Sequence, residues 1–245
     1  MKISAEETIG AIVAKNISTA PVFENFGLDF CCHGNRTLAA ACNEAGVDPG
    51  MVISLIEQID QEKDPGADYD TWPLDQLADH IESTHHAYVT RQIPLLAGYL
   101  AKICSVHGKQ HPELFEIKEI FADSAEDLTM HMHKEEKMLF PFIRKLAQAQ
   151  KDGSGLPAAP FGSAKNPIQV MMREHDAEGS RFQQIAALSR QYTPPADACN
   201  TYKATLAGLQ HFENDLHIHI HLENNILFPE AVQLESTLSG NGHLR

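Results

Sequence analysis

Hydrophobic residues recur along most of the chain with the spacing of amphipathic helices. From Ile117 to Phe142, and again from Tyr202 to Ile226, the core positions follow one another at steps of three or four residues. This spacing predicts long helices over residues 73–106, 112–149, 167–191 and 197–234. Pro94, inside the first helix, predicts a kink or a local break. We therefore expect an all-α protein built on a four-helix bundle.

The beginning of the chain predicts a separate small helical unit. Short helical patterns cover residues 8–14, 38–45 and 51–59. Residues 25–35 contain two glycines and two adjacent cysteines, which indicates a loop. The sequence Asp64-Pro-Gly-Ala-Asp interrupts the helical pattern and predicts a linker near residues 62–72. We predict a small helical domain over residues 1–62 and the bundle over residues 73–236.

One eleven-residue phrase occurs twice in the predicted helices, as HMHKEEKMLFP at 131–141 and as HIHLENNILFP at 219–229. Each copy places a histidine four residues before a glutamate, so that His131 and Glu135, like His219 and Glu223, share one helix face. All four lie on the stripes where a bundle core requires apolar side chains. A buried carboxylate is costly unless it is paired or bound to metal. One such pair alone is weak evidence, but two copies on core stripes predict metal ligands.

Two further histidines fit the same repeat. His86 and His175 precede His131 and His219 by nearly equal distances, so the chain order is a helical hairpin used twice. This order predicts a bundle with pseudo-two-fold symmetry and two metals at its centre. For the first helix the periodicity slightly favours the neighbouring His85, so both histidines remain candidates.

The ligand types restrict the metal. Four imidazoles and two carboxylates suit iron, manganese or zinc, and carboxylates that bridge two ions favour iron or manganese. Asp127, one turn before His131, and Glu174, beside His175, are either acceptors that support the ligands or solvated charges. We favour solvated charges for both.

Composition excludes some classes of partner. The net charge of −14 argues against a nucleic-acid partner, because phosphate binding requires clustered lysine and arginine. The sequence has no apolar run long enough for a membrane span and no secretory signal, so we expect a cytoplasmic protein. Five cysteines, an odd number, favour reduced thiols in a reducing compartment. Cys42, Cys104 and Cys199 are interpreted as helix-packing residues.

These motifs resemble those of the RIC (repair of iron centres) family. HHAYVTRQIP at 85–94, both copies of the repeat and REHDAEG at 173–179 are similar to its hemerythrin-like domain. GLDFCCHGNRTLAAAC at 27–42 is similar to its double-cysteine N-terminal domain. The resemblance implies an oxo- or hydroxo-bridged centre of two Fe ions and selects His86 over His85. The ligands that it implies are His86, His131, Glu135, His175, His219 and Glu223.

We expect His86 and His131 to bind one iron and His175 and His219 the other, with both glutamates bridging. The resemblance implies repair of iron–sulfur clusters damaged by nitrosative or oxidative stress, with iron supplied to the damaged proteins. The alternative is a nitric oxide sensor or reductase, since open coordination positions suit nitric oxide or dioxygen. An oxygen or iron store is a third interpretation, which the cysteine domain disfavours.

Cys31 and Cys32 are the other chemical feature. Adjacent side chains diverge and rarely chelate one ion, but a thiol pair on a turn could accept iron, exchange disulfides or attack a nitrosylated centre. Without the resemblance we favour half-buried apolar thiols; with it, a redox or iron-transfer role. A homodimer would form if the small domain docks on a neighbouring bundle.

Overall fold

A computed structural model describes residues 3–61 and 68–241 of the chain. Within these residues every regular element is a helix, and the β pairing is one isolated antiparallel bridge between Thr8 and Thr37. The all-α prediction is therefore confirmed. The chain forms two compact units, one from the described parts of residues 1–79, 142–168 and 217–245, the other from residues 80–141 and 169–216. Each unit is described by itself.

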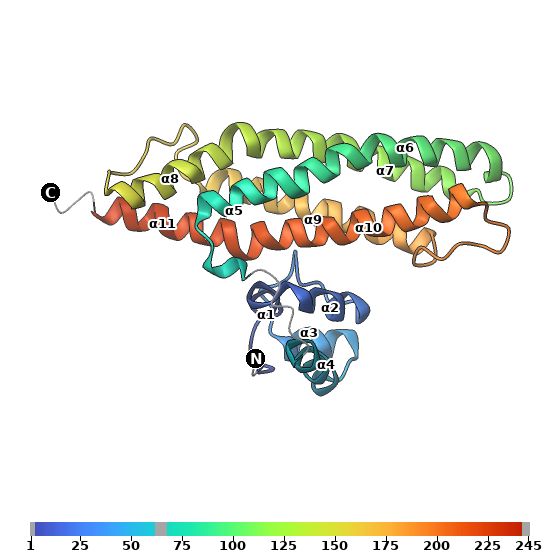
Figure 1. Cartoon of the computed structure of the whole chain (residues 1–245), viewed down its shortest axis with the longest axis horizontal. Coiled ribbons are helices and arrows are strands. Elements are labelled where there is room, and N and C mark those ends of the chain that lie inside the picture. Colours follow the sequence, from blue (N-terminus) through green and yellow to red (C-terminus); the bar gives the residue numbers. More distant parts are fainter. Residues whose placement is uncertain (1–2, 62–67, 242–245) are drawn as a thin grey trace. The chain divides into compact units, whose positions relative to one another are not determined.

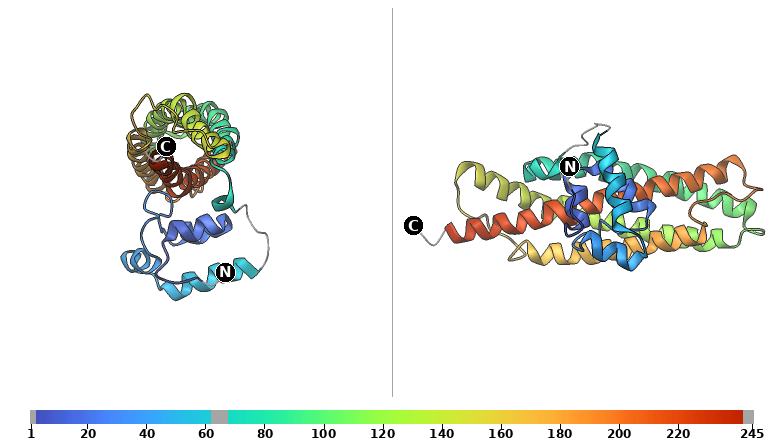
Figure 2. Two further views of the ribbon diagram at one scale, coloured as in Figure 1. Left: turned by 90° about the vertical axis from the view of Figure 1, so that its left-hand side faces the viewer. Right: turned by 90° about the horizontal axis from the view of Figure 1, so that it is seen from below.

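Four long helices run side by side in the second unit (Figures 1 and 2). They are α6 (Ala87–His107), α7 (Glu113–Lys134), α9 (Lys165–Leu188) and α10 (Asn200–Leu222). The second unit contains α9 from Gln169 onward and α10 as far as Leu216. One aromatic ring from each helix meets in the core. The buried ring of Phe212 lies 5.6 Å from Phe121, 5.4 Å from Phe182 and 6.2 Å from Tyr88, measured between ring centroids. The apolar stripes seen in the sequence thus form a packed bundle.

The first long helix is interrupted at a different place from the one predicted. It consists of α5 (Leu74–His80), a π-helical turn η3 (Ile81–His86) and α6, which continues through Pro94 without interruption. The local break predicted at Pro94 is therefore wrong. The departure from α geometry occurs instead in the turn that ends at His86, where a wider turn accommodates one extra residue.

The two copies of the repeat also contain π-helical turns. In the second predicted helix, α7 leads into η4 (Glu135–Leu139) and then α8 (Phe140–Asp152). In the fourth, α10 leads into η5 (Glu223–Leu227) and then α11 (Phe228–Asn241). Pro141 and Pro229 lie in the first turns of α8 and α11. There the missing N–H of proline is tolerated, so the proline of each copy follows a bulge without ending the helix.

The N-terminal part of the first unit contains four short helices, α1 (Ile9–Lys15), α2 (Ala20–Asn25), α3 (Leu38–Ala45) and α4 (Pro49–Gln61). Thr8 and Thr37 cap α1 and α3 with their side-chain oxygens. The predicted helices and the cysteine loop are confirmed, but α2 and the short 3-10 turn η1 (Ile17–Thr19) were not predicted. Residues 62–67 of the predicted linker lie outside the described residues, and η2 (Tyr69–Thr71) follows them.

A buried carboxylate anchors the start of α9 in the first unit. Glu235 of α11 accepts hydrogen bonds from the Ser163 hydroxyl at 2.8 Å and from the Ala164 N–H at 3.1 Å. The carboxylate thus satisfies an N–H that the beginning of a helix leaves without an intrahelical partner.

The domain boundaries predicted at residues 62 and 73 stay predictions.

Replacing Phe212 with alanine should destabilise the metal-free protein by about 3–5 kcal/mol, because it removes the ring that all four helices share. Chemical denaturation in the presence of a chelator measures the change. Phe115→Ala is the matched control, since that ring is half exposed and its loss should cost about 0.5 kcal/mol or less. Equal effects from both variants would contradict this description of the core.

Candidate metal centre

Three of the predicted ligands converge in the second unit. His131 and Glu135 come from α7 and the start of η4, and His175 comes from α9. The Nε2 atoms of His131 and His175 lie 3.0 Å apart, and the His131 Nε2 atom lies 3.3 Å from Glu135 Oε1. All three side chains are buried, and their donor atoms lie within 4.8 Å of one another. This spacing suits ligands of one ion.

Glu135 also faces His86, at the end of η3. Its second oxygen, Oε2, lies 3.4 Å from His86 Nε2. Each oxygen of the fully buried carboxylate therefore faces a different imidazole. A carboxylate arranged in this way is suited to bridge two metal ions, one beside each histidine.

The Nδ1 atoms of His86 and His131, the ring nitrogens that do not face Glu135, each lie beside another carboxylate. His86 Nδ1 lies 3.0 Å from Glu136, and His131 Nδ1 lies 2.8 Å from Glu174, which also pairs with Lys134. The hydrogen bond from His131, followed by that from Lys134, lowers the pKa of Glu174 to about 2 against the effect of burial. A carboxylate can only accept, so Nδ1 carries the proton and Nε2 turns a lone pair toward Glu135.

His219 and Glu223 form the corresponding pair in the first unit. The His219 Nε2 atom lies 3.1 Å from Glu223 Oε1, and both side chains are buried. All six predicted ligands belong to buried groups of histidine and glutamate that could hold a metal ion. The set fits a transition metal, because imidazole lone pairs and buried carboxylates are all electron-pair donors that a cation would stabilise.

The neighbouring histidine, His85, has a different partner. Its Nδ1 atom lies 3.0 Å from Asp215 of α10, and its ring packs edge-on against His80. Of the adjacent pair, His86 is therefore the one that faces Glu135.

The expected pairing of ligands along the chain is wrong for His131. It lies against His175 of α9, not with His86 of its own hairpin. The direction of the side chain on the helix face, which chain order does not reveal, decides the pairing.

The two acidic residues interpreted as solvated charges differ. Asp127 is mostly exposed and pairs with Arg181, as expected. Glu174 instead supports His131, so this interpretation was wrong for Glu174. Sequence reasoning also missed Glu178, a buried carboxylate that accepts a 2.6 Å hydrogen bond from Ser124. Burial raises the pKa of Glu178, although Ser124 and Arg181 donate to it.

The cysteine loop is organised by one aspartate. Asp29 Oδ1 accepts the N–H groups of Cys31 and Cys32 at 3.2 and 2.9 Å, and Oδ2 lies 2.6 Å from His33 Nδ1. The two thiol sulfurs are 3.8 Å apart. The adjacent Cys32 thiol, burial and the Asp29 carboxylate raise the pKa of Cys31 well above its usual value. The loop thus favours a protonated Cys31 thiol beside a carboxylate. Asp29, Cys31 and Cys32 are also three groups that could hold a metal ion.

The comparisons with known proteins agree with this geometry. Residues 5–60 match a family described as a domain of unknown function, DUF542 (ScdA_N), and residues 77–231 match the hemerythrin HHE cation-binding domain. The iron–sulfur cluster repair protein YtfE of Yersinia pseudotuberculosis serotype IB (strain PB1/+) is 34% identical over 229 residues, which cover 94% of this chain and 98% of that protein. The YtfE proteins of Yersinia pestis strains Pestoides F and bv. Antiqua Angola match equally well.

The chain belongs to the RIC family of iron–sulfur cluster repair proteins. The resemblance drawn from the sequence motifs is thereby confirmed, together with the hemerythrin-like helical bundle. The six-residue ligand set and the role of the thiol pair stay predictions.

Two adjacent asparagines, Asn224 and Asn225, connect the second copy of the repeat to the cysteine loop of this RIC protein within the first unit. The side chain of Asn225, on η5, donates to the backbone carbonyls of Phe30 and Cys31 at 3.2 and 3.0 Å. His221 packs beside it against the Phe30 ring, and burial lowers the pKa of His221 to about 4. Sequence reasoning missed these contacts. The available signal was the difference between EEK at 135–137 and ENN at 223–225.

The remaining cysteines do not all serve helix packing. Cys42 and Cys104 are buried as predicted, but Cys199 is exposed, so that interpretation was wrong for Cys199. Cys199 precedes α10, and the N–H of Tyr202 and the side chain of His107 lower the pKa of its thiol to about 7. Its place before the first turn of a helix explains both the exposure and the acidity.

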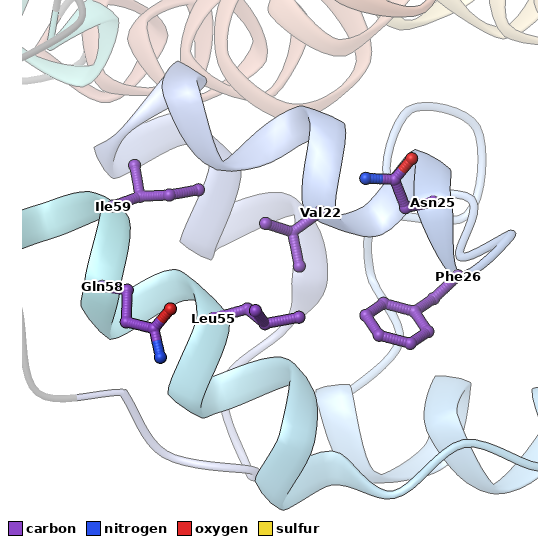
Figure 3. A pocket seen from close by; sticks show the side chains of 6 residues that line it. All are labelled: Val22, Asn25, Phe26, Leu55, Gln58 and Ile59. Atoms are coloured by element: carbon purple, nitrogen blue, oxygen red, sulfur yellow. The ribbon is translucent and has the colours of Figure 1, made fainter.

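Two further observations concern binding surfaces. A groove of about 360 Å³ between α2 and α4 is lined by Val22, Asn25, Phe26, Leu55, Gln58 and Ile59 (Figure 3). This lining contains no histidine, cysteine or carboxylate, so the groove is not a candidate metal site.

Among residues 3–61 and 68–241, no helix combines the length and the apolar character that crossing a membrane requires.

Replacing Glu174 with alanine should weaken iron binding about 10- to 100-fold, because His131 loses the acceptor that fixes its tautomer and orientation. Competition with a coloured chelator measures the affinity. Asp176→Ala, which removes an exposed carboxylate on the same helix, is the control and should leave the affinity unchanged. Equal affinities in the Glu174→Ala variant and the unmodified protein would show that Glu174 does not support the centre.

Proposed function

We propose that this protein repairs iron–sulfur clusters damaged by nitrosative or oxidative stress, and that it does so by supplying iron to the damaged proteins. The observation that carries the proposal is the pair of fully buried carboxylates, Glu135 and Glu223, each beside the Nε2 atom of a histidine. Membership of the RIC family, and the relatives named as iron–sulfur cluster repair proteins, support a role in repair.

The proposed centre holds two iron ions. His131 and His175 would serve one ion, a pairing supported by the 3.0 Å distance between their Nε2 atoms. His86 and His219 would then serve the other, and Glu135 and Glu223 would bridge. When bound, such a centre supplies Lewis acidity, redox change and coordination positions that small ligands can occupy. Six protein side chains would leave such positions open on two ions.

The residues around the proposed ligands keep the histidine rings in one orientation and one protonation state. Glu136 and Glu174 keep the Nδ1 protons of His86 and His131, so the inner nitrogens stay available as ligands. Lys134 neutralises Glu174 on the outer side. Protonation of these histidines would release a cation, so the outer carboxylates bear on both the retention and the release of iron.

Cys31 and Cys32 are the proposed redox or iron-transfer residues. Their sulfurs lie close together, and the Asp29 carboxylate beside them could accept a proton when a thiol reacts. The five cysteines all lie among the described residues and form no disulfide there, which supports a place of action in a reducing compartment such as the cytoplasm. A homodimer stays a prediction from the sequence.

Nitric oxide reduction is the second candidate function, because the proposed centre would have open positions for small ligands. The two functions differ in their product. Incubating the reduced, iron-loaded protein with nitric oxide and measuring nitrous oxide over many turnovers tests the second. Recovery of a cluster-damaged dehydratase tests the first. Turnover to nitrous oxide without recovery of the dehydratase would replace the repair proposal with the reductase.

Glu135→Leu and Glu223→Leu should each reduce bound iron below the two ions per chain expected for the unmodified protein. In the metal-free state both variants should be at least as stable as the unmodified protein, because a buried charge becomes an apolar side chain. Metal analysis and denaturation with a chelator measure the two effects. Glu126→Leu, at an exposed position of α7, is the control and should retain both ions. Full iron content in the buried-site variants would refute the ligand assignment.

Replacing Cys31 and Cys32 together with alanine should reduce dehydratase recovery at least about tenfold while leaving bound iron unchanged, because the thiol pair is proposed to act after iron is loaded. Initial recovery rates and metal content measure the two quantities. Cys199→Ala removes an exposed thiol elsewhere and is the matched control. Unchanged recovery in the double variant would exclude a transfer role for the pair.

A further inference from the structure

The amide of Asn225 lies in a socket formed by the cysteine loop. Its Nδ2 atom donates to the carbonyls of Phe30 and Cys31 at 3.2 and 3.0 Å, and the adjacent Asn224 donates to the same Cys31 carbonyl at 3.4 Å. The loop is therefore held through its backbone at the residue that carries the first thiol. These hydrogen bonds end on backbone carbonyl oxygens, so they fix the loop without using the sulfur atom of Cys31 or Cys32.

Two glycines make room for the Asn225 amide. A Cβ atom added to Gly10 would lie 2.5 Å from Asn225 Oδ1, and one added to Gly34 would overlap the same oxygen. The N–H of Gly10 also donates to the carbonyl of Gly34 at 2.8 Å, which closes this side of the socket. The socket thus accepts the carboxamide only because both positions lack a side chain.

A histidine closes another side. The Nδ1 atom of His221 lies 3.2 Å from Asn225 Nδ2, and the His221 ring packs edge-on against Phe30 with centroids 5.5 Å apart. The amide nitrogen therefore faces three acceptors, the His221 ring and two loop carbonyls. This arrangement fixes which end of the amide points to the loop.

Asn225 belongs to the same π-helical turn as Glu223, so the contact with the cysteine loop is made directly beside a proposed ligand. Asn225 is the third residue of η5, and Glu223 is the first. In the other copy the second and third positions of η4 hold Glu136 and Lys137, where η5 has Asn224 and Asn225. Glu136 contacts His86, and Lys137 is exposed. The same π-helical turn thus serves a ligand in one copy and the thiol loop in the other.

We propose that Asn225 is a positioning residue that fixes the Cys31–Cys32 loop to the turn bearing Glu223, and that it links metal binding at Glu223 to the accessibility of the thiols. The proposal rests on the proposed function, in which Glu223 is a ligand and the thiols react. Metal binding at Glu223 orders the turn, and an ordered turn holds the loop more tightly. By reciprocity, release of the loop weakens the hold on the metal.

Site-resolved alkylation of the full-length protein tests the proposal. The protein is treated with iodoacetamide, metal-free and loaded with ferrous iron without oxygen, and the labelling of Cys31 and Cys32 is followed by mass spectrometry. Cys199 lies in the other unit and is exposed, so its labelling rate is the internal standard. In the unmodified protein, iron should slow the labelling of Cys31 relative to Cys199.

Asn225→Ala and the nearly isosteric Asn225→Asp should each speed the labelling of Cys31 in the metal-free protein about tenfold, since the loop loses hydrogen bonds that close it. Both should also abolish the slowing by iron. Gly34→Ala, whose added Cβ would overlap both Asn225 Oδ1 and the Phe30 carbonyl, should have the same effect. Lys137→Ala is the matched control from the other copy and should change neither rate.

An unchanged Cys31 rate in both Asn225 variants overturns the proposal, and so does an equal rise in Lys137→Ala, which would indicate general loosening. If the Asn225 variants expose Cys31 but iron slows labelling in them as in the unmodified protein, the linkage is wrong. If the unmodified protein binds no iron, the proposed function fails, and the metal-free rates alone decide whether Asn225 positions the loop.

Discussion

The burial of two carboxylates, Glu135 and Glu223, is the constraint on which the rest of the bundle depends. A carboxylate in an apolar interior is expensive, and His86 and His131 offset the cost of burying Glu135 poorly while their Nδ1 protons are committed to outer carboxylates. A cation between these groups converts the lone pairs that face one another into ligands. Metal binding is then coupled to the stability of the bundle, as in other proteins whose site does not exist in the unfolded chain.

The two copies of the repeat share this constraint and differ around it. In the first copy, the residue after the buried glutamate is Glu136, which orients His86. In the second copy, Asn224 and Asn225 hold the cysteine loop. The inner donors are thus alike, while the outer residues connect one half to the ligand histidines and the other to the thiols.

Much of the fold could be predicted because burial imposes a period on the sequence. The core stripes located the long helices, and the anomaly of His and Glu on those stripes located the ligand candidates. The sequence could not locate the π-helical turns, because one added residue changes the helix locally without a distinctive composition. The pairing of His131 with His175 and the support from Glu174 depend on directions across the bundle. Asn225 was missed because its partners are backbone carbonyls, which every sequence contains.

The bulges at η3, η4 and η5 also limit how this protein can change in evolution. Each residue turns an α-helix by about 100°, so the loss of one residue from η4 would rotate all of α8 by that angle. Phe142, Ile143 and Leu146, now buried, would then turn toward solvent. A single-codon deletion in such a turn would therefore damage the site and a remote part of the core together. We expect descendants of this chain to vary in their loops while keeping the length of these helices fixed.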